Sequence, residues 1–396
     1  MITHKTKPNI IVFLDYYLPG NLAGGPIRTI ANMVKGLSND FNFKLVTRDR
    51  DLGEKNKYDK IKTRVWINKD NNSVMYINPF LNNLYFIKLL KSTEYDLIYL
   101  NSFFSYWATL NILIYRKLGL IKNVPIILAP RGEFSPSALE IKKKKKYFFI
   151  KFANFFNLYN GIIWQASSED EKTFISTFLD VNFEFKSVDT KIFVAPDLVE
   201  NFNTKYSELK IINKKSKLHV LFLSRIVRIK NLNFLINVLS KIDHEILFSI
   251  YGPAEDYTYW LECQELLSNL PKNINWKYHG PVEHERIHQI FEENDVMFLP
   301  TKGENFGHVI FEALQNGLPV VLSNKTLWKT HISGCLKAIP LIEDLWINEL
   351  YYWIGLTSEQ KHKLKIDALE FANEYLQHSD SLLLNKNLFN KALNKL

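Results

Sequence analysis

The chain has 396 residues, of which 46% are apolar and 14% aromatic, and it carries a formal charge of +9 at pH 7. This length suits two domains with a core each, so the composition excludes disorder as a description of the whole chain. The charge indicates an anionic partner. No nucleic-acid-binding motif accompanies it, so a phosphorylated substrate or lipid head groups fit better than nucleic acid.

The N-terminal half alternates strand-like apolar runs with helical patterns. Its opening, MITHKTKPNIIVFLDYYLPG, has a five-residue apolar core that predicts a first strand rather than a signal peptide, and we expect a cytoplasmic protein. The alternation predicts a parallel sheet of βα units, a domain over residues 1–199. The expected strands are 9–14, 43–47, 73–77, 96–100, 125–129, 162–165 and 191–195.

Residues 200–217 are polar and rich in lysine and asparagine, which is typical of a linker. A second doubly wound domain is expected over 218–375, and the helical segment 376–396 could pack back on the first domain. The expected fold is therefore α/β with two facing Rossmann-like domains and a cleft between them, where strand ends would hold ligands. The strands predicted in the second domain are 218–223, 246–251, 275–279, 295–299 and 319–322.

The stretch GENFGHVIFE at 303–312 follows the strand expected at 295–299. On one helix, Glu304 and Glu312 would lie ~80° apart, neither stacked nor opposed. A simpler interpretation places Glu304 in a loop and Glu312 in a helix that begins near His308. Such a loop directs backbone N–H groups and the positive end of a helix toward one point, which predicts an anion site.

The stretch SRIVRIK after the strand 218–223 carries Arg225 and Lys230, followed by Asn231 as a candidate helix cap. Two cations at the end of a strand would neutralise a diphosphate. The alternative, that Arg225, Arg228 and Lys230 are solvated loop charges, is equally supported by this stretch alone. Because both loops leave strands of one sheet, their anion-binding groups can converge.

Together these stretches resemble the retaining glycosyltransferases of family 4, which have the GT-B fold. The signature is a Glu, seven residues and a Glu, here Glu304 and Glu312, with an upstream Arg-x4-Lys pair, here Arg225 and Lys230. Supporting strings are AGGPIRTIANMVKGL, APRGEFSPSAL, YGPAED and NGLPVVLSNKTLW. PRGEFSP-like and ENFGHVI-like strings are similar to those of enzymes that assemble bacterial O-antigen, lipopolysaccharide, capsule and exopolysaccharide.

The resemblance implies a metal-independent enzyme that needs no cofactor. It would move a sugar from a nucleotide donor, with a UDP-sugar expected, to a polyprenyl-diphosphate-linked saccharide. Arg225 and Lys230 would bind the donor diphosphate, Glu304 the donor-sugar hydroxyls and Glu312 the ribose. Glycines at 24 and 25 would let backbone approach the donor, although an ordinary tight turn explains them equally well. Besides Glu312, the expected donor-binding residues are Gly24, Gly25, Gly252, Asn305, Phe306, Gly307 and His308.

On the acceptor side, the resemblance implies that Arg131 binds a phosphate and Glu133 orients the attacking hydroxyl. A salt bridge or cap that shapes the loop is an equally good role for both residues. Downstream, the run Lys142–Lys146 precedes an aromatic stripe at 148, 152, 155, 156 and 159. This pattern predicts either a helix on the anionic inner-leaflet surface of the inner membrane or a solvated charge run leading into a core helix.

Three motifs point to other chemistry and are discounted. His284 to His288 matches the HExxH zinc pattern, with Glu304 as a conceivable third ligand, but apolar spacing leaves both histidines at the border of the helix's buried face. Asp49 and Asp51 mimic a metal-binding DxD, yet a solvated loop explains them better. No third glycine or spaced acid supports NAD binding. A GT-B epimerase or phosphorylase and a non-catalytic saccharide or nucleotide-sugar sensor remain alternative functions.

Overall fold

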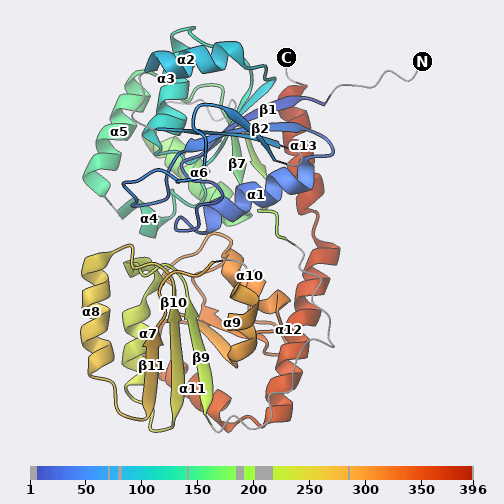
Figure 1. The fold of residues 1–396 in the computed structure, drawn as a ribbon. Coiled ribbons are helices and arrows are strands. Elements are labelled where there is room, and N and C mark those ends of the chain that lie inside the picture. The colour runs from blue at the N-terminus through green and yellow to red at the C-terminus, as the bar shows by residue number, and fades with distance from the viewer. Residues whose placement is uncertain are drawn as a thin grey trace. The chain divides into compact units, whose positions relative to one another are not determined.

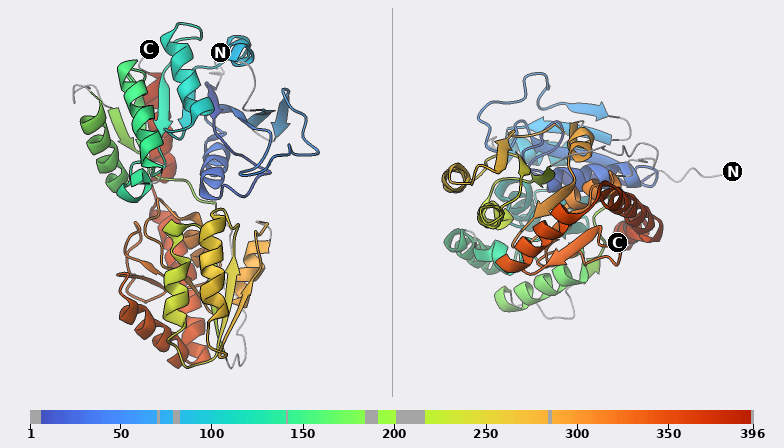
Figure 2. Two further views of the ribbon diagram at one scale, coloured as in Figure 1. Left: turned by 90° about the vertical axis from the view of Figure 1, so that its left-hand side faces the viewer. Right: turned by 90° about the horizontal axis from the view of Figure 1, so that it is seen from below.

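A computed structural model describes residues 7–69, 72–78, 83–140, 142–183, 191–200, 217–283 and 286–394. It divides into two compact units, one of Met1–Leu198 with Asp380–Leu396 and the other of Val199–Ser379. Each unit is a sheet with helices on both faces (Figures 1 and 2). The expected fold class, two Rossmann-like α/β domains, is confirmed, whereas the cleft between them stays a prediction.

The N-terminal unit contains an eight-stranded sheet in the order β3-β4-β2-β1-β5-β6-β7-β8. Its neighbours pair in parallel except β3, which runs antiparallel to β4 at the edge. The expectation of a wholly parallel sheet is therefore wrong at this edge. The strands are β1 (Asn9–Phe13), β2 (Asn42–Arg48), β3 (Trp66–Lys69), β4 (Asn72–Ile77), β5 (Leu97–Asn101), β6 (Ile126–Ala129), β7 (Ile163–Ala166) and β8 (Lys191–Val194).

Helices cover both faces of this sheet because their apolar stripes pack on its buried side chains. The last of them comes from the far end of the sequence, and its Phe389 is fully buried against Tyr99, with ring centroids 5.7 Å apart. The helices are α1 (Gly25–Leu37), α2 (Asn83–Ser92), the π-helix η1 (Tyr106–Leu110), α3 (Asn111–Lys117), α4 (Pro136–Glu140), α5 (Lys143–Phe155), α6 (Glu169–Asn182) and α13 (Ser381–Leu393).

The C-terminal unit contains a six-stranded parallel sheet in the order β11-β10-β9-β12-β13-β14. Its strands are β9 (Leu218–Leu223), β10 (Ile246–Tyr251), β11 (Ile274–Tyr278), β12 (Val296–Leu299), β13 (Val320–Ser323) and β14 (Leu336–Ile339), the last of which was not expected. Its helices are η4 (Arg228–Lys230), α7 (Leu232–Leu239), α8 (Tyr257–Ser268), α9 (Ile287–Glu293), α10 (His308–Gln315), α11 (Glu343–Gly355) and α12 (Ser358–His378).

The boundaries of the units differ from the expected ones. The expected start of the C-terminal segment at residue 376 falls inside α12, which continues to His378. The chain passes from one unit to the other after Leu198 and again after Ser379. Most of the predicted linker, residues 201–216, lies outside the described residues. In the described ranges, no helix is both long enough and apolar enough to cross a bilayer.

Candidate functional site

The loops after β9 and β12 meet at the carboxyl edge of the C-terminal sheet. The two strands are parallel neighbours, with Met297 opposite Leu221. Beyond the strands, Lys302 donates its backbone N–H to the Ile229 carbonyl at 2.7 Å, and Thr301 Oγ1 donates to the same oxygen at 3.2 Å. These bonds hold the RIK stretch and the GENFG loop side by side, as their position at the ends of one sheet predicts.

Lys230 and Glu304 form an ion pair between the two loops. Their side chains are only 8% and 17% exposed. A buried charge is stable only when it is paired, because leaving water costs several kcal/mol per ion. The structure thus excludes the solvated-charge interpretation for Lys230 and places it beside the expected sugar-binding glutamate.

Buried contacts hold the GENFG loop in place. Phe306 is buried, and its carbonyl accepts a 2.7 Å hydrogen bond from Trp328 Nε1. Gly307 adopts a φ of 77°, and a Cβ there would lie 2.8 Å from Glu304 Cγ, so this position requires glycine. Helix α10 then begins at His308, as expected, and Glu312 lies half-buried inside it.

Arg225 forms a separate ion pair, with Glu255. Its Nη1 donates to Glu255 Oε2 at 2.8 Å, and both side chains are 35% exposed. A Cβ on Gly252, whose φ is 128°, would lie 1.9 Å from the Ser224 carbonyl oxygen. Glycine there lets the loop after β10 approach the loop that carries Arg225. Sequence reasoning missed Glu255, since the YGPAED string gave no sign that its glutamate pairs with an arginine.

On the N-terminal unit, Gly24 has a φ of 66° and stands just before α1, as the tight turn predicts. Asp51 Oδ2 accepts hydrogen bonds from the backbone N–H groups of Asn21, at 2.7 Å, and Leu22, at 3.1 Å. Asp49 and Asp51 are only 5% and 8% exposed, so the prediction of a solvated loop is wrong. Asp51 instead anchors the glycine turn, a role that the DxD spacing concealed.

Arg131 is largely buried and ion-paired with Asp197. It also donates to Tyr99 Oη at 2.6 Å and to Asn101 Oδ1 at 3.1 Å. Burial opposes the charged guanidinium, but Asp197 raises the pKa of Arg131 above its ordinary value. These contacts match the loop-shaping role, and phosphate binding by Arg131 stays a prediction.

Glu133 is held by three donors. It accepts hydrogen bonds from Ser102 Oγ at 2.6 Å and from the backbone N–H groups of Phe103, at 2.5 Å, and Phe104, at 3.3 Å. Burial raises the pKa of Glu133 from 4.5 to about 7. The side chain thus fixes residues 102–104, whereas its expected contact with the acceptor stays a prediction.

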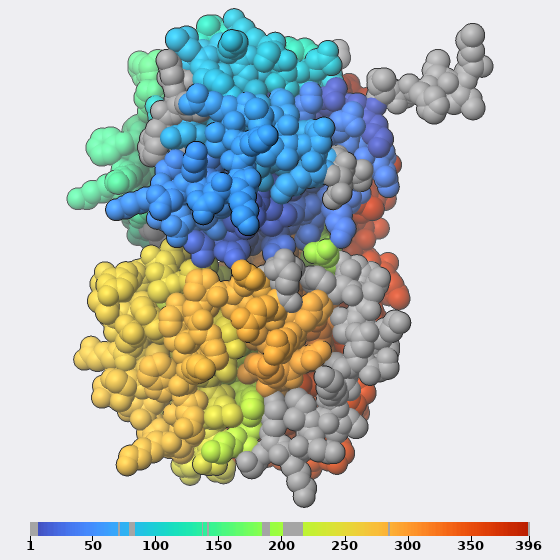
Figure 3. All heavy atoms as spheres, viewed as in Figure 1, coloured from blue at the N-terminus to red at the C-terminus, as the bar shows by residue number. Residues whose placement is uncertain are grey.

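Helix α5 exposes most of the aromatic stripe. Phe148 is 71% exposed and Phe155 is 83% exposed, and Phe152 and Phe156 are also exposed. This finding contradicts the core-helix interpretation for these four residues. Tyr159 differs, because it is buried and stacks on Phe103 with ring centroids 4.4 Å apart. The prediction that Tyr159 belongs to the exposed stripe is therefore wrong. Figure 3 shows side chains of the green segment that contains α5 projecting from the surface.

Two residues of the expected zinc pattern, His284 and Glu285, lie outside the described residues. Over the described part of the chain, no group of three or more His, Cys, Asp or Glu side chains is arranged to hold a metal ion.

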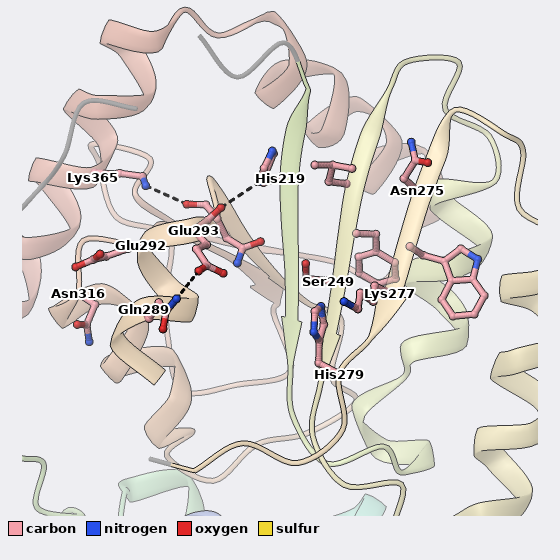
Figure 4. A pocket seen from close by; sticks show the side chains of 14 residues that line it. His219, Ser249, Asn275, Lys277, His279, Gln289, Glu292, Glu293, Asn316 and Lys365 are labelled. Atoms are coloured by element: carbon pink, nitrogen blue, oxygen red, sulfur yellow. Dashed lines mark hydrogen bonds between the residues drawn. The ribbon is translucent and has the colours of Figure 1, made fainter. Parts of the chain in front are cut away.

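A cavity of about 880 Å³ lies elsewhere in the C-terminal unit, between α9 and strands β9 to β11 (Figure 4). Its walls include Lys277 and His279, and at its side Lys365 Nζ donates to the Asn294 carbonyl at 2.9 Å. Neither Lys230 nor Glu304 lines it. We therefore place the candidate site at the loops, where charges and helix terminus meet, and not in this cavity.

The two doubly wound α/β units match the GT-B fold of solved glycosyltransferase structures. Solved structures of this fold include the sucrose-phosphate synthase of Thermosynechococcus elongatus, with a TM-score of 0.72, 13% identity, and coverage of 99% of this chain and 100% of that one. Alr3699/HepE of Anabaena, in complex with UDP-glucose, has a TM-score of 0.67 and 19% identity, covering 98% and 100%.

Residues 204–331 match the family described as Glycosyl transferases group 1. The C-terminal unit is therefore similar to this family over those residues, and the expected likeness to family 4 enzymes is confirmed. A protein encoded in the cps region of Klebsiella pneumoniae is 25% identical over 306 residues, which are 75% of this chain and 79% of that protein.

Proposed function

We propose that this chain is a retaining glycosyltransferase that moves a sugar from a nucleotide-sugar donor, with UDP as the carrier, to a polyprenyl-diphosphate-linked saccharide in cell-surface polysaccharide synthesis. The observation that carries the proposal is the buried Lys230–Glu304 pair at the start of α10. The family match spans both residues. The capsule-region relative and the UDP-glucose complex of a protein with the same fold support the pathway and the donor.

The chemistry follows from where charge develops. Transfer breaks the bond between the sugar's anomeric carbon and a diphosphate oxygen, so negative charge grows on the leaving group. Lys230 and Arg225 would stabilise that charge, together with the backbone N–H groups at the start of α10. Glu304, already held by Lys230, would accept hydrogen bonds from the donor-sugar hydroxyls, and Glu312 would bind the ribose. Gly24, Gly25, Gly252 and Asn305 would line the donor.

The test begins with a panel of nucleotide sugars, the binding of which should raise the melting temperature of the native protein. With the donor so identified, Lys230→Ala and Glu304→Gln should each lower turnover at least about a hundredfold, the order seen when one transition-state stabiliser is removed. Arg228→Gln is the matched control, because Arg228 is 57% exposed and pairs with Glu262. Near-normal turnover in both site variants, with the fold intact, would refute the site.

The proposed enzyme needs no metal, since Arg225 and Lys230 would take the place of a cation at the diphosphate. Activity should therefore persist in EDTA. Complete loss of activity in EDTA that Mn²⁺ or Mg²⁺ restores would contradict this proposal. It would favour metal binding by Asp49 and Asp51 instead.

We also propose that the enzyme works at the cytoplasmic face of the inner membrane, where a lipid-linked acceptor would be anchored. Four lysines, Lys142 to Lys145, are exposed at the start of α5, and exposed phenylalanines follow along the helix. Cations attract anionic head groups and aromatic rings insert at the interface, which together favour peripheral binding.

A further inference from the structure

Asp15 and Arg48 form an ion pair at the carboxyl edge of the N-terminal sheet, with Arg48 Nη2 2.6 Å from Asp15 Oδ1. Their strands, β1 and β2, are parallel neighbours in which Phe13 lies opposite Val46. Pairing continues past the strands, because the Arg48 backbone N–H donates to the Asp15 carbonyl at 3.4 Å. The pair thus emerges at the edge where open α/β sheets bind their ligands.

The pair leaves part of its hydrogen-bonding capacity unused. Asp15 Oδ1 alone accepts from Arg48 Nε at 3.0 Å, Arg48 Nη2 at 2.6 Å and Trp107 Nε1 at 2.6 Å. Within the described ranges, Asp15 Oδ2 and Arg48 Nη1 have no hydrogen-bond partner. The side chains are 24% and 27% exposed. The two side chains of one ion pair, each partly exposed, therefore keep an acceptor and a donor that a ligand can use.

Two aromatic rings hold the Arg48 guanidinium in its orientation. The Arg48 guanidinium carbon lies 5.2 Å from the centroid of the Tyr16 ring and 5.7 Å from that of Trp107. Such contacts stabilise a cation, and Trp107 is itself buried in η1. π-Helices occur frequently at functional sites. The donor and acceptor are thus held in place before any ligand arrives, which lowers the cost of binding.

We infer that Asp15 and Arg48 bind two neighbouring hydroxyl groups of the acceptor saccharide, a role that rests on the proposed glycosyl transfer. One hydroxyl donates to Asp15 Oδ2 and its neighbour accepts from Arg48 Nη1. A sugar suits this pair because each hydroxyl can donate or accept, whereas a carboxylate only accepts and a guanidinium only donates. Both bonds are charge-assisted, hence strong and directional. The Tyr16 ring offers an apolar body beside the polar pair.

Two substitutions separate this role from a structural one. Asp15→Asn keeps an Oδ1 acceptor for Arg48 and Trp107 but turns the open oxygen into a donor amide. Arg48→Lys keeps the charge and removes the planar fork. Arg50→Lys is the control, since Arg50 pairs with Asp49, at 2.9 Å, a short distance along the same segment.

The probes are p-nitrophenyl glycosides of glucose, galactose, mannose and N-acetylglucosamine, measured by saturation-transfer NMR in the presence of UDP. A charge-assisted hydrogen bond corresponds to about a tenfold change in affinity or more. Asp15→Asn and Arg48→Lys should therefore each raise the dissociation constant of the best glycoside at least about tenfold, and Arg50→Lys should leave it unchanged. Monodeoxy versions of that glycoside should identify the two hydroxyls in the wild type.

The same samples, heated with and without UDP, distinguish the possible failures. Unchanged glycoside affinity in both variants, or no glycoside binding by a wild type that UDP stabilises, would overturn the subsite alone. A wild type that neither UDP nor any nucleotide sugar stabilises would overturn the proposed function. Loss of glycoside affinity in both variants beside an unchanged control, in a protein that UDP stabilises, would support the subsite.

Discussion

Among the acidic side chains that the structure describes, Glu133 has a strongly raised pKa. Burial raises its pKa from 4.5 to about 7, although three donors oppose the rise. Between these two pH values the folded protein keeps a proton that the unfolded chain has lost. The contribution of Glu133 to the free energy of unfolding is therefore complete below the lower value and lost as pH rises through the upper one.

Substitution of Glu133 tests this coupling. Glu133→Gln resembles the protonated acid, because its amide can donate to Ser102 Oγ while its oxygen accepts from the backbone at residues 103 and 104. The melting temperature of the variant should fall less than that of the wild type between about pH 5 and about pH 8. Glu140→Gln, which alters a 70% exposed carboxylate, should keep the wild-type slope. Equal slopes in all three proteins would show that Glu133 does not govern this dependence.

Residue identities were predictable where a motif carries the chemistry. Lys230, Glu304 and Gly307 follow from the paired strings, and the structure brings them together. The carboxylates that fix neighbouring loops were not predictable. Glu255 pairs with Arg225, and Asp51 accepts from the backbone N–H groups of Asn21 and Leu22. An isolated carboxylate in a loop carries no local sign of a partner that lies about thirty residues away.

At the scale of elements, strands with buried faces were predictable, whereas two of the four edge strands, β3 and β14, were not. β5 is buried throughout, and its continuous apolar run is typical of a central parallel strand. β3, with the sequence WINK, and β14, with LKAI, are four residues long and mostly half-buried or exposed. Their pairing is set by the neighbouring strand more than by their own pattern, which is why the sequence does not reveal them.

Helix α5 yields the prediction at this scale. Wild-type protein should float with vesicles that contain anionic lipid, and binding should weaken as salt screens the charges. Each lysine near such a surface contributes about 1 kcal/mol, so changing Lys142, Lys143, Lys144 and Lys145 to Gln should greatly reduce flotation. Phe148→Ser with Phe155→Ser should reduce it as well, since these rings are exposed in the free protein.

A matched control removes the same charge elsewhere on the same unit. Lys55, Lys57, Lys60 and Lys62 are exposed in one loop of the N-terminal unit. Their change to Gln should leave flotation close to that of the wild type. If both lysine variants float equally, net charge rather than α5 governs binding, and absence of flotation by the wild type would remove the membrane role.

At the scale of the whole molecule, the N-terminal unit is assembled from two separate parts of the sequence. α13 buries Leu388, Phe389 and Ala392 in the core of the N-terminal sheet. A side-chain network adds to this attachment, because Asn385 Nδ2 donates to the Pro196 carbonyl at 2.7 Å. The helical character of this segment was predictable. The expected boundary at residue 376 was wrong, because it falls inside α12, which continues to His378.

Phe389→Ala should destabilise the N-terminal unit by about 3–5 kcal/mol, the usual cost of removing a fully buried aromatic side chain. Hydrogen exchange should show faster opening in β1, β2 and β5 than in the wild type, while α12 and the strands of the C-terminal unit stay unchanged. Leu383→Ala on the same helix, at a position 55% exposed, is the control and should have little effect. Uniform acceleration across both units would mean that the units do not unfold separately.

The divided N-terminal unit has a consequence for synthesis on the ribosome. Residues 199–379, the entire C-terminal unit, are translated between Leu198 and the start of α13. At ordinary elongation rates this takes roughly ten to forty seconds. During that time the nascent sheet lacks the cover that Phe389 gives to Phe41, Phe43 and Tyr99. The unit that is made first is therefore the one that matures last, and it must be kept from aggregation while it waits.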